Sequence, residues 1–407
     1  MNPSVLHHIH LTLFGGLQTH FLRFLEYSAR MYGYRNAALL EQPAVHHAAA
    51  AALHRGVAVA GHPKYIGRMK IPGWPKSLRA ARRRWLFEQA DADTGILWNG
   101  LGRLQVAREL RDHDLRCLYW EHGASWDAHH CPEKVERFWA QLDGVFCNSN
   151  AARRMLQLRW DCPLDVSVCL NGVASSLRRK PAVIRQAPSG RYFRFGTAGH
   201  LRTCKGAHIA IAAVAELKRR GVNAELRIAG TGPKEAEMRA LAERLGVAER
   251  IRFCGFVSDM QGFYDELDCY VHPAMREAFG LVCAEAMLAG CPVIATEIDG
   301  LPEVVTHNQT GLCVTPRCEV GELQLLHTEL EPRVDCVYDP RADAVVEPRF
   351  VAPADLADAM GEIATRPDML ERFSRHAIDD ANGRLSFERH MQRVHAIVAD
   401  YPRPDPL

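Results

Sequence analysis

Residues 271–296 read Val-His-Pro-Ala-Met-Arg-Glu-Ala-Phe-Gly-Leu-Val-Cys-Ala-Glu-Ala-Met-Leu-Ala-Gly-Cys-Pro-Val-Ile-Ala-Thr, and this stretch decides the fold. An apolar run is followed by a polar loop, a segment with helical periodicity and a second apolar run. This order predicts strand, loop, helix and strand, the unit from which parallel α/β sheets are built.

Two carboxylates and a glycine in this stretch predict a binding site. Glu277 falls in the loop, and Glu285 lies eight positions later, inside the predicted helix. Gly280 lets the loop backbone approach a ligand closely, and the first helix amides would face an anion with the positive end of the helix dipole. We therefore expect a diphosphate to rest at the helix start, with the two carboxylates gripping sugar hydroxyls on either side. The expected binding residues of this turn are Phe279, Gly280, Leu281, Val282 and Glu285.

The same alternation of apolar runs and helical segments extends in both directions. It predicts strands at 5–14, 95–99, 117–121, 144–149 and 165–170, and again at 193–197, 224–229, 250–256, 269–273 and 292–296. The polar stretch 181–190 between the two sets has no periodicity and predicts a linker. We expect an α/β protein of two Rossmann-like domains, at 1–180 and 191–385, with a helix in the C-terminal residues 386–407. Residues 317–350 are rich in acids and proline and have no predicted role.

Composition excludes several classes of protein. The 407 residues are 47% hydrophobic and 24% charged, which is typical of globular domains and not of disordered or coiled-coil chains. No apolar run reaches the length of a membrane span. The 13 cysteines form no Cys-x-x-Cys pair and no secretory signal precedes them, so we expect reduced thiols, a cytoplasmic location and no metal site. Asp91 and Asp93 form an Asp-x-Asp pattern, which is interpreted as a solvated helix end.

The net charge of +2 conceals a basic segment at residues 55–85. Residues 42–87 contain no acidic side chain, while Trp and Ile alternate with lysines and arginines. Cations for anionic headgroups and aromatics for the interface are what a peripheral membrane surface needs. An ordinary solvated helix face and RNA binding remain alternatives, although the balanced charge elsewhere argues against a nucleic-acid partner.

Several ordered motifs together resemble the family 4 retaining glycosyltransferases of the GT-B fold. The quoted stretch is similar to the family's Glu-x7-Glu signature. Gly199–Gly206 (Gly-His-Leu-Arg-Thr-Cys-Lys-Gly) is similar to its Gly-Arg-Leu-x-x-x-Lys-Gly loop. The remaining matches are Gly230-Thr-Gly-Pro233, Gly255-Phe-Val257, Gly300-Leu-Pro-Glu303 and Asn171-Gly-Val173. The resemblance is close across about 190–316 and only architectural before that.

The resemblance implies a role for each matching residue. Lys205 would pair with the diphosphate of a nucleotide sugar, Glu285 would hold the ribose hydroxyls, and Glu277 would contact the donor sugar. Gly230, Gly255, Phe256 and Val257 would line the nucleotide site, and Gly15 and Gly16 would form the glycine loop of the N-terminal domain. His122 stands where the family has its active-site histidine, so Glu277, Lys205 and His122 are the implied catalytic residues. The N-terminal domain would bind the acceptor and the C-terminal domain the nucleotide sugar. The two domains would face each other across a cleft, with the C-terminal helix returning to the N-terminal domain.

One position departs from the family pattern. The family has arginine five residues before the lysine, whereas this chain has His200, whose imidazole is only partly charged near neutral pH. Three outcomes remain open: Arg202 supplies the charge, His200 acts itself, or activity is reduced or lost.

The implied reaction is transfer of a hexose, with retention, to a glycan acceptor in lipopolysaccharide or another cell-surface polysaccharide. A UDP-sugar is the first donor to consider, with GDP- and ADP-sugars as alternatives and no obligatory metal. The acceptor would be a glycan or a glycolipid, reached through an anionic membrane surface by the 55–85 segment. A soluble acceptor and a non-catalytic nucleotide-sugar-binding relative are the competing hypotheses.

Overall fold

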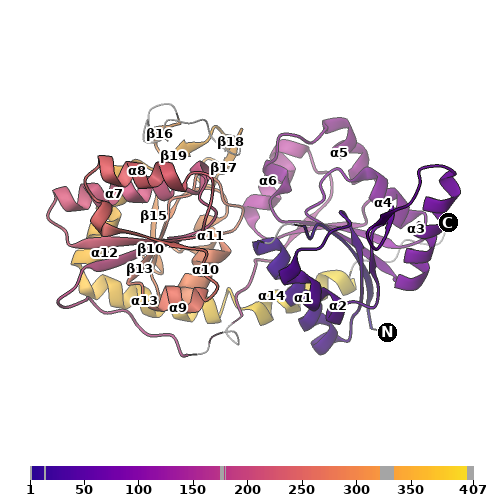
Figure 1. The fold of residues 1–407 in the computed structure, drawn as a ribbon, viewed down its shortest axis with the longest axis horizontal. Helices are drawn as coiled ribbons and strands as arrows, with labels where there is room; N and C mark the ends of the chain where they lie inside the picture. The colour runs from indigo at the N-terminus through magenta and orange to yellow at the C-terminus, as the bar shows by residue number, and fades with distance from the viewer. Residues whose placement is uncertain (1, 13–14, 175–177, 179, 321–333, 401–407) are drawn as a thin grey trace. The chain divides into compact units, whose positions relative to one another are not determined.

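The chain divides into two compact units in a computed structural model. The described residues are 2–12, 15–174, 178, 180–320 and 334–400. The N-terminal unit comprises residues 1–148, 155–170 and 390–407, and the C-terminal unit comprises 149–154 and 171–389. Each unit is a sheet with helices on both faces (Figure 1). The α/β prediction with two Rossmann-like domains is confirmed.

A seven-stranded parallel sheet forms the centre of the N-terminal unit, in the order β3-β2-β1-β6-β7-β8-β9. Its strands are β1 (Ser4–Ile9), β2 (Arg35–Leu40), β3 (Ala60–Gly61), β6 (Thr94–Trp98), β7 (Arg116–Glu121), β8 (Gly144–Cys147) and β9 (Val166–Val168). The helices are α1 (Gly16–Tyr32), α2 (His47–Gly56), α3 (Lys76–Ala90), α4 (Leu104–Arg111), α5 (Pro132–Trp139) and α6 (Asn150–Trp160), with the short hairpin β4 (Tyr65–Ile66) and β5 (Met69–Lys70) before α3. Because helices cover both faces, the strands read as buried apolar runs.

The C-terminal unit has a six-stranded parallel sheet in the order β12-β11-β10-β13-β14-β15. Its strands are β10 (Phe193–Ala198), β11 (Ala224–Ala229), β12 (Ile251–Gly255), β13 (Cys269–His272), β14 (Val293–Thr296) and β15 (Gly311–Val314). The helices are α7 (Ala207–Arg219), α8 (Glu235–Arg244), α9 (Met260–Asp265), α10 (Leu281–Leu288), α11 (Leu301–Val304), α12 (Pro353–Thr365) and α13 (Pro367–Asn382). The strand order reverses between β10 and β13, and open α/β sheets bind ligands at the carboxyl ends of the strands beside such a reversal.

Arg185 anchors the predicted linker, residues 181–190, to the C-terminal unit, while most other residues of the segment are exposed. Arg185 is 7% exposed and donates hydrogen bonds to the carbonyls of Tyr264 and Ala289, each at 3.0 Å. Its backbone amide donates to Ser374 Oγ at 2.7 Å. A side chain that satisfies two buried carbonyls fixes this segment, although its composition resembles that of a linker.

The segment 317–350 contains structure that its weak periodicity does not predict. Within its described residues, β17 (Val337–Asp339) and β18 (Ala344–Val346) form one antiparallel pair, and β16 (Cys318–Glu319) and β19 (Arg349–Phe350) form another. The last helix, α14 (Phe387–Asp400), begins in the C-terminal unit, and from His390 its residues belong to the N-terminal unit. Among the described helices, none has the length and apolar character required to cross a membrane.

Candidate active site

The reversal point of the C-terminal sheet brings two predicted loops together. Lys205 follows β10, and Glu277 follows β13, the strand that pairs with β10. Lys205 Nζ lies 2.7 Å from Glu277 Oε2, although 72 residues separate them in the chain. The loops meet closely because Gly206, at φ 74°, has no side chain: a Cβ there would lie 1.9 Å from the carbonyl oxygen of Pro273.

A histidine that the sequence analysis did not single out completes this cluster. His272 Nε2 lies 3.2 Å from the same oxygen of Glu277, and the His272 side chain is only 2% exposed. Glu277 is therefore held between two nitrogen groups at the end of β13. The sequence signal was present, since His272 lies near the end of the strand predicted at 269–273, just before Pro273.

Electrostatics keep the pair charged. Burial disfavours the charged form of each partner, but the attraction between Lys205 and Glu277 outweighs it. The pKa of Lys205 is consequently raised, and that of Glu277 lies well below its usual range, with His272 contributing. The site therefore presents a permanent ammonium and a permanent carboxylate at neutral pH.

Asp299 anchors the Glu277 loop to two other elements. Its Oδ2 accepts the amide hydrogen of Glu277 at 2.9 Å, and its Oδ1 accepts that of Tyr338 in β17 at 2.7 Å. Asp299 is 1% exposed and has a left-handed backbone at φ 49°. Next to it, a Cβ at Gly300 would lie 2.2 Å from the carbonyl oxygen of Ala278, so the loop and this turn are in direct contact. Sequence reasoning missed Asp299, because nothing local marks it.

The start of α10 has the predicted geometry with one difference. Gly280 caps the helix in a left-handed conformation at φ 97°. The first amides of the helix belong to Leu281, Val282 and Cys283. The amide of Cys283 already donates to the Gly280 carbonyl at 2.9 Å. The amides of Leu281 and Val282 have no acceptor among the described residues, so two amides remain for a ligand. Phe279 is buried, at 2% exposure, and acts as a packing residue here.

Glu285 lies one turn further along α10 and is oriented by a tyrosine. The hydroxyl of Tyr264, in α9, donates to Glu285 Oε2 at 3.2 Å. Tyr264 is buried, at 2% exposure, so its fixed hydroxyl restricts the orientation of the Glu285 carboxylate. This orienting contact was not predicted.

Two further arginines surround the Lys205 loop. Arg202 lowers the pKa of His200, after the larger effect of burial, so His200 is the weaker cation of the two. Burial raises the pKa of the Cys204 thiol, and the positive charges of Lys205, Arg276 and Arg202 lower it. Arg276 comes from the Glu277 loop. Two arginines therefore lie within electrostatic reach of this loop, of which Arg276 was not predicted.

The other turns at this edge come together as well. The amide of Gly230 donates to the carbonyl of Gly255 at 2.7 Å, which joins the ends of β11 and β12. Gly230 has φ 122°, and a Cβ there would lie 1.9 Å from the Gly199 carbonyl oxygen. Phe256, between Gly255 and the half-buried Val257, is 81% exposed. An exposed aromatic beside a glycine turn offers a stacking surface for a planar group.

The N-terminal site residues lie at the carboxyl edge of their own sheet. Gly15 caps α1 with an extended backbone, and a Cβ at Gly16 would meet nothing within 4 Å, so packing does not demand glycine there. His122, after β7, stacks on Trp98 with ring centroids 5.3 Å apart, and its backbone amide donates to Asn99 Oδ1 at 3.1 Å. Burial, with His390 nearby, lowers the pKa of His122 to about 3, so the imidazole is neutral.

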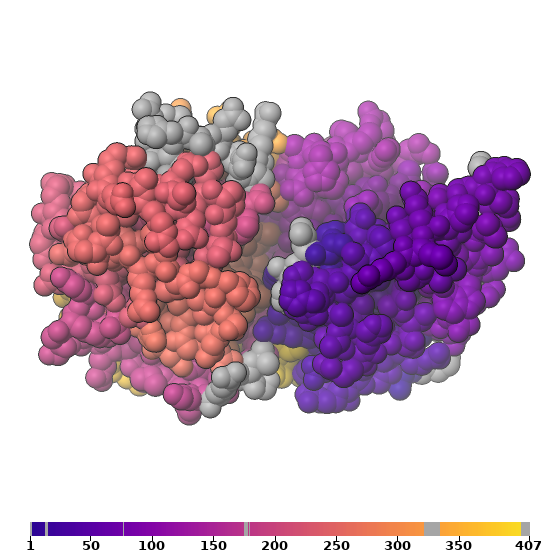
Figure 2. Space-filling view, in the orientation of Figure 1, coloured from indigo at the N-terminus to yellow at the C-terminus, as the bar shows by residue number. Residues whose placement is uncertain are grey.

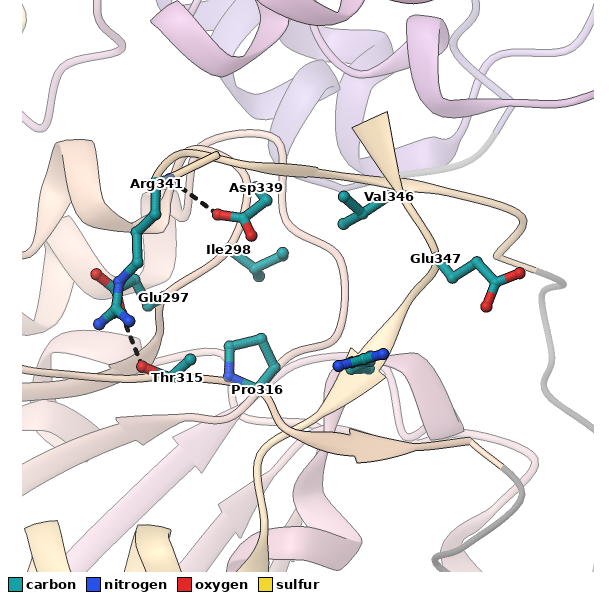
Figure 3. Close-up of a pocket in the computed structure, with 9 residues that line it drawn as sticks. Glu297, Ile298, Thr315, Pro316, Asp339, Arg341, Val346 and Glu347 are labelled. Carbon is teal, nitrogen blue, oxygen red and sulfur yellow. Dashed lines mark hydrogen bonds and ion pairs between the residues drawn. The ribbon is translucent and has the colours of Figure 1, made fainter. Parts of the chain in front are cut away.

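Two other features of the structure lie outside the predicted site. Asp127, His129 and His130 have ligand atoms within 4.8 Å of one another, a spacing that would suit a cation, but His130 Nε2 already lies 3.0 Å from the Ala124 carbonyl oxygen. A cavity of about 520 Å³ lies beside β14, β15 and the β17–β18 hairpin, and Arg341 extends over Glu297 inside it (Figure 3). None of the predicted site residues lines that cavity.

Comparison with known proteins identifies the C-terminal half. Residues 184–330 match the family model described as Glycosyl transferases group 1. The chain is 32% identical over 216 residues to the D-inositol 3-phosphate glycosyltransferase of Corynebacterium jeikeium, covering 51% of this chain and 43% of that protein. It is 30% identical over 190 residues to the lipopolysaccharide core biosynthesis glycosyltransferase LpsD of Rhizobium meliloti, covering 45% and 52%.

The similarity to solved structures extends over the whole chain. The Anabaena HepE protein, solved with UDP and glucose, superposes with a TM-score of 0.72 at 18% identity, covering 98% of this chain and 100% of that one. By contrast, the matches to these two curated relatives span about half of their length or less. The resemblance inferred from the motifs is confirmed for the C-terminal half: residues 184–330 carry a domain that matches the Glycosyl transferases group 1 family, and the chain has the GT-B fold.

Proposed function

We propose that the protein transfers a hexose from a nucleotide diphosphate sugar to a glycan acceptor, with retention of configuration. The observation that carries the proposal is the Lys205–Glu277 ion pair at the reversal point of a parallel sheet. It lies beside a helix start with two available amides, and the same helix carries Glu285.

In this proposal the site acts by stabilising the leaving group. Breaking the bond between sugar and phosphate places about one additional negative charge on the nucleoside diphosphate. Lys205, Arg202 and the amides of Leu281 and Val282 would share that charge. They are held in place before the reaction, so little reorganisation is needed, and this is the main source of electrostatic catalysis.

Glu277 and Glu285 would have separate roles. Glu277, fixed by Asp299 and His272, would accept hydrogen bonds from the donor sugar. Glu285, oriented by Tyr264, would accept hydrogen bonds from the ribose hydroxyls. Both roles require an ionised carboxylate. For Glu277 the lowered pKa supports the ionised form.

We propose UDP as the nucleotide, with GDP and ADP as alternatives. Phe256 would stack on the base, and the backbone of Gly255 and Val257 would contact its edge. The relative solved with UDP and glucose supports this choice of donor. In the N-terminal unit, Gly15 and Gly16 would leave room for the donor, and the neutral His122 would hydrogen-bond a sugar hydroxyl.

For the acceptor we propose a lipid-linked or lipopolysaccharide-type glycan at an anionic membrane surface, in a reducing compartment such as the cytoplasm. All 13 cysteines are free thiols, and a relative is named for lipopolysaccharide core biosynthesis. The hairpin β4–β5 and the start of α3 expose large apolar side chains among cations: Ile66 is 56% exposed, Met69 74% and Trp74 83%. The purple stretch that contains them forms part of the surface of the N-terminal unit in Figure 2.

A turnover assay tests the proposed function. Purified protein is supplied with UDP-, GDP- and ADP-hexoses, and release of the nucleoside diphosphate is followed with and without a glycolipid extract. We expect release with one nucleotide class, stimulated by the extract. Tight donor binding without any release would instead identify a non-catalytic nucleotide-sugar-binding protein.

A further inference from the structure

A second site is present at the carboxyl edge of the N-terminal sheet. A cavity of about 590 Å³ lies where the strand order reverses between β1 and β6, beside the ends of β1 and β2. Its walls come from distant parts of the unit: His8 in β1, Glu41 after β2, Lys64 after β3, Gly102–Glu109 around α4, and Lys134 and Arg137 in α5. We call it the basic pocket. This edge of a parallel sheet is where open α/β domains bind ligands.

The charges around the basic pocket do not balance. Six lysines and arginines line it: Lys64, Arg83, Arg103, Arg108, Lys134 and Arg137. Its two carboxylates are already paired, Glu41 with Arg103 and Glu109 with Arg83. The other four cations have no carboxylate partner among the described ion pairs. A neighbouring depression of about 450 Å³ shares Arg83, Gln105, Arg108 and Glu109 with the pocket and adds the oppositely charged Arg84 and Asp112, so the excess positive charge stays in the pocket itself.

A buried histidine marks the floor of the pocket. His8 is 7% exposed, lines the cavity and has no hydrogen-bond partner among the described residues. Burial, followed by the charges of Arg103 and His62, lowers the pKa of His8 to about 3. Its neutral ring keeps one N–H that can be donated to a ligand in the cavity.

The chemistry of this lining selects an anion with a polar body. Guanidinium groups bind phosphate oxygens in pairs, and ammonium groups bind them as point charges. A phosphoryl group fills only part of the volume of the basic pocket, so a sugar ring also has room there. Lys64 directly precedes β4, so the pocket borders the exposed apolar hairpin that carries Ile66 and Met69.

We propose that the basic pocket binds the phosphoryl or pyrophosphoryl group of the sugar acceptor. The inference rests on the proposed transferase function, in which the N-terminal unit holds the acceptor. The phosphoryl group belongs either to a soluble sugar phosphate or to a lipid-linked sugar, and the border with the apolar hairpin favours the lipid-linked form.

Binding measurements with the donor site filled test the proposal. Isothermal titration is carried out at saturating UDP, so that the probes cannot occupy the nucleotide site. The soluble probes are glucose 6-phosphate and glucose, and the lipid probes are polyprenyl phosphate and polyprenol in the same non-ionic micelles. We expect a phosphorylated probe to bind and its unphosphorylated partner not to bind. Binding of glucose 6-phosphate alone assigns a soluble acceptor, and binding of polyprenyl phosphate alone, or of both, assigns a lipid-linked one.

A pair of variants locates the binding. The double variant Arg108→Ala/Arg137→Ala removes two unpaired cations of the pocket. It should lower the affinity for the phosphorylated probe at least tenfold. Arg30→Ala/Arg393→Ala removes two exposed cations of the same unit outside the pocket and should change its affinity less than twofold. UDP affinity should be equal in all three proteins, and thermal unfolding checks that each is folded.

The outcomes separate the two proposals. If UDP binds but neither phosphorylated probe does, or if both double variants weaken the probe equally, the pocket assignment is overturned and the donor site stands. Glucuronate binding as tightly as glucose 6-phosphate would overturn the choice of a phosphoryl group. If none of UDP, GDP and ADP binds, the proposed transferase function fails first.

Discussion

At the scale of single residues, the decisive contact is the one between Lys205 and Glu277. Each side chain is only partly exposed, at 35% and 19%, so neither would be charged without cost on its own. Together, at 2.7 Å, they place a cation beside the start of α10 and hold the carboxylate ionised.

Replacing the lysine should affect the chemical step. We expect Lys205→Ala to lower kcat by about 10²–10³-fold, by analogy with the loss of one positioned donor to a developing anion. Steady-state kinetics with the active donor measures this. Lys218→Ala is the matched control, because Lys218 also pairs with a carboxylate, Glu249, at 2.8 Å but lies in an exposed pair. A change confined to KM would mean that Lys205 binds ground state and transition state equally.

Glu285 should act on binding rather than on chemistry. A hydrogen bond to a charged group contributes about 1.5–3 kcal/mol, so Glu285→Ala should weaken UDP by more than tenfold. The ribose assignment is tested by 2′-deoxy-UDP, which should bind wild type more weakly than UDP does but should bind the variant almost as well as UDP. If removal of the 2′-hydroxyl weakens binding equally in wild type and in Glu285→Ala, the ribose assignment is contradicted. Tyr264→Phe, which only frees the carboxylate, should have a smaller effect.

At the scale of elements, Asp299 connects the Glu277 loop with β17. Asp299→Ala leaves two buried amides without acceptors, at a cost of about 1–3 kcal/mol each. We expect urea unfolding to show this loss together with a lower kcat. Asp368→Ala, which removes a carboxylate in a loose 3.7 Å pair with Arg366, should change neither quantity. An unaltered unfolding midpoint in Asp299→Ala would show that the loop is fixed by other contacts.

Elements with strong local patterns were predictable from sequence, and long-range anchors were not. The strand at 224–229 is β11 with the same bounds, because the alternation of apolar and charged residues in Ala-Glu-Leu-Arg-Ile-Ala is typical of a β-strand. The strand predicted at 5–14 ends at Ile9. Beyond it, the polar side chains of His10 and Thr12 contact each other, with Thr12 Oγ1 2.6 Å from His10 Nε2. β2, with the sequence Arg-Asn-Ala-Ala-Leu-Leu, has too weak a pattern to be recognised.

The site shows the same division. Gly280, Glu285, Lys205 and Glu277 were found because they belong to one local signature and one local loop. Asp299, Tyr264 and Arg276 were missed, since their roles arise from contacts between elements that the sequence does not place side by side.

At the scale of the whole molecule, the two units differ in their buried histidines. In the N-terminal unit burial lowers the pKa of His7 and His390 to about 4 and that of His8 and His122 to about 3, whereas in the C-terminal unit His208 is the one described histidine whose pKa burial lowers to about 3. The native unit thus binds fewer protons than the unfolded chain, where histidine titrates near 6.5. The resulting stability is complete above pH 6.5 and is lost as the pH falls toward 4.

Acidification should therefore destabilise the N-terminal unit first. Between pH 7.5 and 5.2 each such histidine costs about 1–2 kcal/mol. All seven tryptophans lie between residues 74 and 160, within this unit, so tryptophan fluorescence during urea unfolding reports on it alone. We expect its midpoint to fall markedly at pH 5.2, and circular dichroism to retain a later transition from the C-terminal unit. Equal midpoints at the two pH values would contradict the account.

The central claim is that the reversal point of the C-terminal sheet holds a nucleoside diphosphate. A crystal structure of the chain with UDP tests this most directly. The account predicts the β-phosphate within about 3 Å of Lys205 Nζ and of an amide at the start of α10, with the ribose hydroxyls on Glu285. UDP bound elsewhere, for example in the cavity beside Glu297 and Arg341, with Lys205 and Glu285 untouched, would contradict it.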